Sequence, residues 1–173
     1  MRQDETLDQA AVRVLSEKAN LNNIFLEQLY TFGDLKRDVR KRSVSVAYFA
    51  LVSHPEKLKI ATQDYYRGIE WYALDNLPDL AFGHQQIITT AHKRLKGKLT
   101  YSNIAYSLMP KEFTLTQLQR VYEIILGRKL DKRNFRKKIS SLDILEELDK
   151  KQIDVTHRPA QLYKFKKRAL EVF

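Results

Sequence analysis

The chain has 173 residues, of which 43% are hydrophobic and 30% are charged, and its formal net charge is +10. A chain of this length can bury a core and form one or two small domains. It has no apolar run long enough for a membrane span and no opening signal peptide, so we expect a cytoplasmic protein. The absence of cysteine excludes disulfides and thiolate chemistry, and with only four histidines we expect no metal site and no cofactor.

The positive charge is confined to the C-terminal half of the chain. Residues 93–173 contain 20 Lys or Arg against 9 Asp or Glu, a balance of +11. Residues 1–92 contain 11 basic against 12 acidic residues, a balance of −1. Such asymmetry indicates a boundary between two domains, and it is typical of a domain that attracts the phosphate backbone of nucleic acid.

The first predicted element is an amphipathic helix near the N-terminus. Thr6 and Gln9 have the spacing of a capping box, which predicts where the helix begins. Asn20 is suited to the left-handed position that follows the end of a helix. The apolar residues of this segment recur with helical spacing at Leu7, Ala10, Ala11, Val14 and Leu15.

Strands are predicted after this helix. Their composition and flanking turn residues place them at residues 24–33, 43–53 and 68–74. The second of them is apolar enough to be central in a sheet. A basic loop, residues 34–42, joins the first two strands.

A helix is predicted over residues 84–95, and we expect Gly97 to end it. This helix leads out of the sheet domain and into the basic domain. A shorter helix is predicted over residues 102–108, closed by Pro110.

Residues 113–139 carry the pattern around which the chain is organised. A helix begins at the capping box of Thr114 and Gln117, and it ends at Gly127. Its apolar stripe is Leu115, Leu118, Val121, Tyr122 and Ile125. Asp131 is suited to cap a second helix, whose inward residues are Phe135, Ile139 and Leu142. Helix, tight turn and helix predict a helix-turn-helix.

The outward face of the second helix is strongly basic. Between residues 128 and 138 the chain has seven Lys or Arg and one Asp. A single charge run is more often a solvated face, but here it coincides with the helix predicted to enter a DNA groove. Arg can form two hydrogen bonds with guanine, and Asn can do so with adenine. The candidate DNA-binding residues are Lys132, Arg133, Asn134, Arg136 and Lys137, with Thr116 and Gln117 of the preceding helix as candidate phosphate contacts.

A hairpin is predicted after the helix-turn-helix. Residues 144–148 and 160–167 are expected to pair, which would complete a winged helix. The hairpin tip contains Thr156, His157 and Arg158, and Arg158 is a candidate contact to the sugar-phosphate backbone. An ordinary loop with one arginine is the alternative interpretation.

The chain resembles the NrtR family of Nudix-related transcriptional regulators over nearly its whole length. The part that follows the Nudix box in that family is similar to YTFGDLKRDVRKRSVSVAYFALV of this chain. The linker helix and winged helix of the family are similar to LAFGHQQII, KLTYSNIAYSLMPKEFTLTQLQRVYEIILGRKLDKRNFRKKI and HRPAQLYKF. The resemblance implies a Nudix-fold domain that senses a small ligand, often ADP-ribose, and a winged helix that represses operons, many of them for NAD metabolism.

Compared with the Nudix box, the N-terminal helix matches in part. Glu5, Arg13 and Glu17 fit box positions, whereas Val14 and Lys18 stand where the box has carboxylates, and Asn20 replaces its second glycine. Nudix chemistry needs clustered carboxylates to hold Mg²⁺ against a diphosphate. The resemblance therefore implies a catalytically inactive domain and no enzyme activity. For Glu5, Arg13 and Glu17, an ordinary solvated helix face with an Arg13–Glu17 pair is therefore the better interpretation.

We therefore expect an α+β protein with a partial Nudix-like α/β sheet domain (1–82), a linker helix (83–97) and a winged helix-turn-helix domain (98–173). Family members have an upstream region before the position of Met1, so the sensor domain is expected to be truncated or to be completed by a partner subunit. Expected partners are double-stranded DNA, a second copy of the chain and an effector such as ADP-ribose. Candidate contacts for a phosphate-bearing ligand are Arg37, Arg40 and Arg42, with a solvated basic loop as the alternative.

Three other functions stay open at the level of the sequence. They are a Nudix hydrolase of ADP-ribose or nucleoside diphosphate derivatives, a sugar-responsive regulator of the same family, and a binder of structured RNA.

Overall fold

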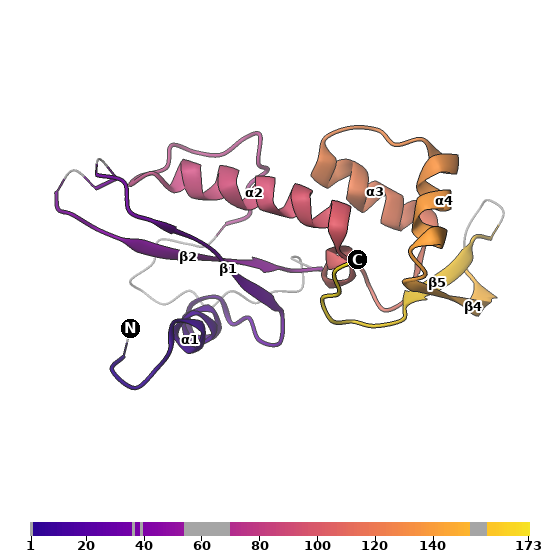
Figure 1. The fold of residues 1–173 in the computed structure, drawn as a ribbon, viewed down its shortest axis with the longest axis horizontal. Coiled ribbons are helices and arrows are strands. Elements are labelled where there is room, and N and C mark those ends of the chain that lie inside the picture. The colour runs from indigo at the N-terminus through magenta and orange to yellow at the C-terminus, as the bar shows by residue number, and fades with distance from the viewer. Residues whose placement is uncertain (1, 36, 39, 54–69, 153–158) are drawn as a thin grey trace. The chain divides into compact units, whose positions relative to one another are not determined.

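The computed structural model describes residues 2–35, 37–38, 40–53, 70–152 and 159–173. The chain forms two compact units, Met1–Ala91 and His92–Phe173, and the division between them falls inside helix α2 (His84–Tyr101). Figure 1 shows the elements of both units in chain order. In the described ranges, no helix is long and apolar enough to cross a membrane.

The N-terminal unit contains one helix and a two-stranded sheet. Strand β1 (Phe25–Phe32) pairs with β2 (Ser45–Leu51) in antiparallel register, as predicted. Helix α1 (Leu7–Ala19) lies beside this sheet, and the Tyr48 hydroxyl of β2 donates a hydrogen bond to the Asp8 carboxylate of α1 at 2.5 Å. None of the residues of α1 is fully buried, and an open apolar groove of about 480 Å³ separates the helix from the sheet.

The predicted signals at the ends of α1 are confirmed. The Thr6 hydroxyl accepts the Gln9 N–H at 3.2 Å, and the Gln9 side chain accepts the Thr6 N–H at 2.8 Å. Asn20 has a φ of 52°, the left-handed conformation expected after the last turn.

One prediction for the sheet is wrong. Of the predicted strand 68–74, Glu70–Leu74 is described and forms no strand, and Trp71, Tyr72 and Leu74 are exposed. Branched and aromatic residues favour a strand only where a partner strand supplies hydrogen bonds. The prediction that β2 is central in the sheet stays a prediction: among the described residues β2 pairs with β1, and residues 54–69 lie outside them.

The prediction that Gly97 ends the second helix is also wrong. Helix α2 continues to Tyr101, and Leu99 in its last turn is buried. A glycine inside a helix costs only about 1 kcal/mol relative to alanine, which burial of one leucine outweighs. The predicted helix at residues 102–108 is a shorter 3₁₀ helix, η2 (Ile104–Ser107).

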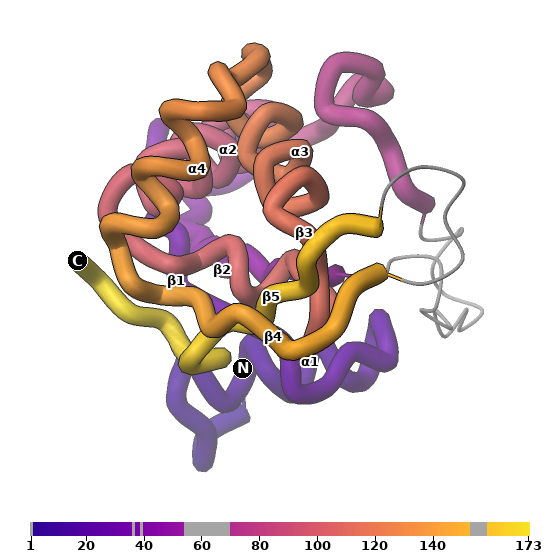
Figure 2. The backbone as a smooth tube through the Cα atoms, turned by 90° about the vertical axis from the view of Figure 1, so that its right-hand side faces the viewer, coloured from indigo at the N-terminus to yellow at the C-terminus, as the bar shows by residue number. Residues whose placement is uncertain are grey.

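The C-terminal unit is a winged helix. Helices α3 (Leu115–Leu126) and α4 (Lys132–Ser141) form the helix-turn-helix, and strands β4 (Leu145–Lys151) and β5 (Gln161–Phe165) form the predicted hairpin. A third strand, β3 (Phe113–Thr114), was not predicted, and the sheet order is β3-β5-β4. Figure 2 shows both helices with the three strands.

An aromatic core holds this unit together. The Phe113 and Phe165 rings lie 5.2 Å apart, and the Tyr122 and Phe135 rings, from α3 and α4, meet edge to face at 5.2 Å. Such pairs add about 1 kcal/mol each to the burial of their apolar area. The core therefore fixes α4 against α3 through the predicted inward face.

The segment after the wing, residues 166–173, packs against the end of α2 and against η2. The buried Asn103 side chain donates to the Ala169 carbonyl at 3.0 Å and accepts the Glu171 N–H at 2.8 Å. The Arg168 guanidinium donates to three backbone carbonyls at 2.9–3.0 Å, those of Tyr106, Met109 and Pro110.

Candidate nucleic-acid interface

Local capping defines the start of α4 and the turn before it. Gly127 has a φ of 70° and ends α3, as predicted. The Asp131 carboxylate accepts the Asn134 N–H at 2.8 Å, which confirms it as the N-cap of α4. Phe135 and Ile139 are buried, as predicted, so the opposite side of α4 is directed to solvent.

The exposed residues of α4 fall on one ridge and two flanks. At 3.6 residues per turn, Arg133 and Lys137 lie on the ridge opposite the buried residues. Lys132 and Arg136, four residues apart, share one flank, and Asn134 lies on the other flank. The predicted DNA-binding residues of α4 are therefore all exposed, but they do not share one face.

Asn134 lies in a different environment from the arginines of α4. It lines a cavity of about 380 Å³ together with Thr100 of α2 and Tyr122 of α3. Burial raises the pKa of the Tyr122 phenol to about 12. Arg136, on the opposite flank, is near enough to Tyr163 of β5 for its positive charge to act on that phenol.

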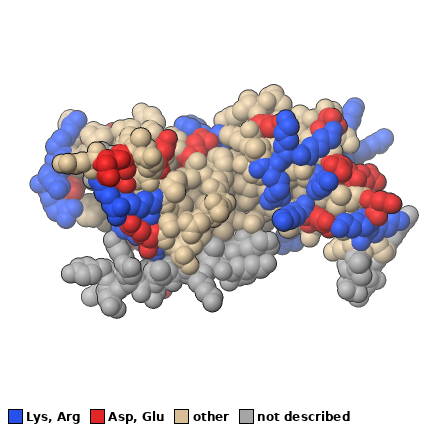
Figure 3. Space-filling model, turned by 90° about the horizontal axis from the view of Figure 1, so that it is seen from below, with Lys and Arg blue, Asp and Glu red and all other residues tan. Residues whose placement is uncertain are grey.

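The cations on the exposed side of α4 differ in their ion pairs from those around the wing. Within the described ranges, none of Lys132, Arg133, Arg136 and Lys137 forms an ion pair. The cations around the wing do: ion pairs join Lys164 to Glu146, Lys166 to Asp143 and Lys150 to Glu112, at 3.0, 2.6 and 2.6 Å. Figure 3 shows basic and acidic side chains close together on the right, over the C-terminal unit. The excess positive charge of this unit is thus available on α4.

The other predicted contacts have different outcomes. Thr116 is exposed in the first turn of α3. The side-chain oxygen Oε1 of Gln117 accepts hydrogen bonds from both the N–H and the hydroxyl of Thr114, at 2.7 and 3.2 Å. The helix cap therefore occupies this oxygen. Arg158, with the rest of the wing tip, lies outside the described residues. Sequence reasoning missed Arg120, although its spacing of four from Thr116 puts both on one face of α3.

In the N-terminal unit, Arg13 connects the residues that fit the Nudix box. Its guanidinium donates two hydrogen bonds to Glu5, at 2.7 and 2.8 Å, and one to Glu17 at 3.0 Å. The Arg13–Glu17 pair was expected, and the Glu5 contact is additional. The hydrogen bonds from Arg13 lower the pKa of Glu5 to about 2. Because these carboxylates are bound to Arg13 and Lys18 stands at a box position for a carboxylate, this donor set does not fit Mg²⁺.

The basic loop between β1 and β2 is internally bonded. Arg40 binds Asp38 through two hydrogen bonds of 3.0 Å and stacks on the Phe82 ring at 4.5 Å, and these bonds lower the pKa of Asp38 to about 2. Arg37 donates to the Ser45 hydroxyl, but its buried Nε has no partner in the described part of the chain. Arg42 is exposed. A ligand at this loop would therefore compete with Asp38 for Arg40.

Comparisons with known proteins agree with this architecture. A family model described as the NrtR DNA-binding winged helix domain matches residues 105–165. A protein of Acinetobacter baylyi named ADPR responsive transcriptional repressor NtrR is 41% identical over 167 residues, which cover 95% of this chain and 66% of that protein. The chain therefore spans just under two thirds of the length of this relative.

Solved structures show the same similarity. Shewanella oneidensis NrtR complexed with a 27mer DNA is 35% identical with a TM-score of 0.79, and the match covers 95% of this chain and 74% of that one. NrtR of the same organism without DNA is 36% identical with a TM-score of 0.77, covering 94% and 74%. A MutT/nudix family protein from Enterococcus faecalis, 24% identical with a TM-score of 0.70 over 96% and 72% of the two chains, shows the Nudix-like fold.

Proposed function

The chain belongs to the NrtR family of Nudix-related, DNA-binding transcriptional regulators, and on that basis we propose that it is a repressor that binds duplex DNA through α4. The observation that carries this proposal is a group of exposed cations on α4, Lys132, Arg133, Arg136 and Lys137, which form no ion pair with any residue in the described part of the chain, while the opposite side of the helix is buried. Phosphates of DNA would supply the missing negative charge, and Arg133 and Lys137 are placed to reach base edges in the major groove. Lys132, Arg136 and Thr116 are proposed as backbone contacts, and Arg158 as a further one.

We propose that the N-terminal unit is a catalytically inactive sensor of ADP-ribose or a related metabolite. The name of the Acinetobacter baylyi relative supports the effector, and the Arg13-bound carboxylates support the inactivity. Arg37, Arg40 and Arg42 are proposed as contacts for the phosphates of the ligand. In functional terms, residues 1–82 would sense, 83–97 would connect, and 98–173 would read DNA.

The active form would be a homodimer, because two winged helices related by a twofold axis read two half-sites of a palindromic operator. Ligand binding would favour a conformation with lower affinity for DNA, and it would release the operator through that difference in affinity. The regulated genes would be those of NAD metabolism.

The test begins by selecting the preferred duplex of the full chain from a random pool. Its affinity is then measured by fluorescence anisotropy with and without ADP-ribose. We expect a Kd on the order of nanomolar, together with a palindromic preference, and weaker binding when ADP-ribose is added. Failure to enrich any sequence would contradict the proposal.

Substitution separates base reading from charge. Arg133→Ala with Arg136→Ala should abolish specific binding. Arg133→Lys alone should keep non-specific affinity but lose discrimination by roughly tenfold or more, because lysine cannot form the paired hydrogen bonds that arginine makes with guanine. Equal affinity of the alanine variant and the wild type for the selected duplex would refute the assignment of α4.

Two further measurements test the hydrolase and the RNA-binding alternatives. Incubation with Mg²⁺ and ADP-ribose should yield no AMP, whereas AMP formation would identify a hydrolase. Structured RNA should compete with the selected duplex no better than unrelated DNA does, and preferential competition would favour an RNA-binding protein.

A further inference from the structure

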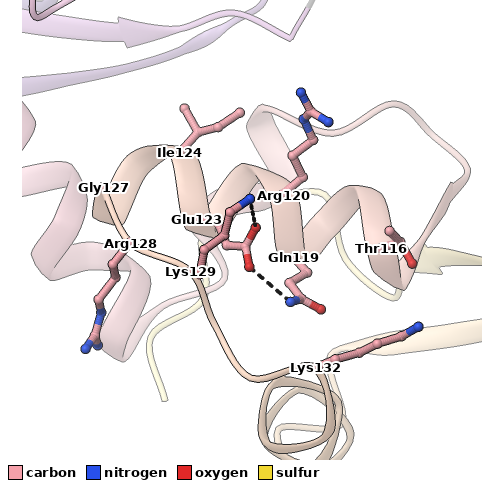
Figure 4. A pocket seen from close by; sticks show the side chains of 9 residues that line it. All are labelled: Thr116, Gln119, Arg120, Glu123, Ile124, Gly127, Arg128, Lys129 and Lys132. Atoms are coloured by element: carbon pink, nitrogen blue, oxygen red, sulfur yellow. Dashed lines mark hydrogen bonds and ion pairs between the residues drawn. The ribbon is translucent and has the colours of Figure 1, made fainter.

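A cationic groove runs along the side of α3 that faces away from the core. It has a volume of about 720 Å³, and its lining includes Thr116, Arg120, Ile124, Arg128 and Lys132. Figure 4 shows these side chains around it, from α3, from the turn after Gly127 and from the first residue of α4. Thr116, Arg120 and Ile124 are spaced by four residues and so form one stripe of α3.

The positive charge of the groove is not balanced from within. Arg120, Arg128 and Lys132 form no ion pair with any residue that the structure describes. The one carboxylate, Glu123, accepts the Leu130 N–H at 2.9 Å and the Gln119 amide at 3.1 Å, and it lies 3.6 Å from Lys129. The carboxylate of Glu123 is thus bound by Leu130, Gln119 and Lys129. Arg120, Arg128 and Lys132 therefore remain to bind an external anion.

The groove is continuous with the proposed DNA-reading surface. Lys132 belongs both to the groove and to the flank of α4 that carries Arg136. Thr116 lies in the first turn of α3, where backbone N–H groups favour an anion. An anionic polymer placed against α4 would therefore extend into the groove. This continuity favours a polymer over a small anion as the ligand of the groove.

We propose that this groove binds the sugar-phosphate backbone of the DNA strand that borders the major groove read by α4. Arg120 and Lys132 contact successive stretches of phosphate, and the exposed Ile124 packs against deoxyribose. These contacts carry charge and position but no sequence information. The inference rests on the proposed function, and it adds a second contact surface outside the recognition helix.

The test uses the salt dependence of binding. The Kd of the full chain is measured at several KCl concentrations, both for the selected duplex and for a scrambled duplex of equal length. Arg120→Ala should weaken binding to both by the same factor, roughly fivefold to tenfold at ~0.1 M salt, and lower the slope of log K against log[KCl] by about 0.9. Arg133→Ala, in contrast, should weaken binding to the selected duplex more than to the scrambled one.

Control variants isolate the groove. Arg120→Lys should restore the slope, and Lys93→Ala, which removes an exposed cation of α2 outside the groove, should leave it unchanged. Ile124→Glu places a negative charge in the groove at a side chain that is 68% exposed, so it should fold normally and weaken binding to both duplexes.

Two results would overturn the inference while leaving sequence-specific binding intact. The first is a wild-type slope and affinity for both Arg120→Ala and Ile124→Glu. The second is dissociation of a dimer by Ile124→Glu, seen by sedimentation, with the slope unchanged, which would assign the groove to a second copy of the chain.

Discussion

Arg13 bridges a residue before α1 and a residue within it. Its hydrogen bonds to Glu5 and Glu17 tie the segment before Thr6 to the body of the helix. The Glu5 side chain is only 10% exposed, and its carboxylate accepts hydrogen bonds from the Arg13 guanidinium and from the Arg2 N–H. The residues that fit the Nudix box therefore hold the N-terminal end of α1 in place.

This bridge predicts a pH effect on stability. The folded-state pKa of Glu5 is about 2 against an ordinary value of 4.5, so its contribution is present above pH 4.5 and is lost as the pH falls towards 2. Glu5→Gln should lower the melting temperature at pH 7, and the difference from wild type should shrink as the pH falls through this window. Melting followed by circular dichroism between pH 7 and 2.5 measures it. A constant difference would refute the assignment, and Asp4→Asn, an exposed neighbour, should behave as wild type.

At the scale of elements, two helix glycines have opposite roles. Gly97 lies inside α2, and apart from the backbone of that helix and the two neighbouring residues no heavy atom of the described residues lies within 4 Å of an added Cβ, whereas Gly127 ends α3 with a φ of +70°. Gly97→Ala should stabilise the protein by about 0.5–1 kcal/mol, and Gly127→Ala should destabilise it by about 1–2 kcal/mol. Urea unfolding of both variants checks the pair. Equal effects would mean that α2 ends near Gly97 after all.

The C-terminal segment predicts a second effect at this scale. Asn103→Ala leaves the Glu171 N–H and the Ala169 carbonyl without their buried partner, which should cost about 2 kcal/mol. Lys167→Ala removes only the exposed ion pair with Glu171, which should change stability by less than about 0.5 kcal/mol. If urea unfolding gave both variants the same stability, the packing of residues 166–173 would not contribute to the fold.

The elements differ in how far their sequence predicts them. The ends of α1, α3 and α4 follow from short-range chemistry, in which Thr6, Thr114 and Asp131 bond to backbone three residues on. Strand β3 has two residues and exists only because Tyr163 and Leu162 lie beside it, which no local pattern reveals. Residues 70–74 have the composition of a strand but form none, because no described strand lies beside them to supply hydrogen bonds.

The candidate site shows the same division. The spacing of Phe135 and Ile139 identified the buried side of α4, and therefore its basic side. The separation of Asn134 from Arg136 depends on what packs against each flank, which sequence composition does not contain. The groove beside Arg120 was missed because its cations come from α3, the turn and α4 together.

At the scale of the whole molecule, the buried apolar residues are distributed unequally. In the described ranges the N-terminal unit buries only Leu29, Phe32 and Leu51, whereas the C-terminal unit buries twelve such residues. The two units also carry different charge, since the positive excess belongs to residues 93–173. The parts proposed to sense the ligand and to read DNA therefore differ in the size of their buried core and in their net charge.

This distribution predicts two unfolding transitions in calorimetry of the full chain, with the N-terminal unit melting first. Phe135→Ala should lower only the temperature of the upper transition, because removing a core ring costs the C-terminal unit about 3–5 kcal/mol of unfolding free energy. Leu29→Ala should lower only the temperature of the transition of the N-terminal unit. A single transition that both substitutions shift equally would show that the units unfold together.

The helix α4 keeps its folding residues and its exposed residues separate. Asp131, Phe135 and Ile139 hold the helix in place, and none of them is among the side chains proposed to meet DNA. Substitutions among the side chains proposed to meet DNA therefore leave the residues that hold the helix in place unchanged. Under the proposed function, a lineage with this domain could acquire new target genes through substitutions on one helix surface, and an engineer could change the same surface.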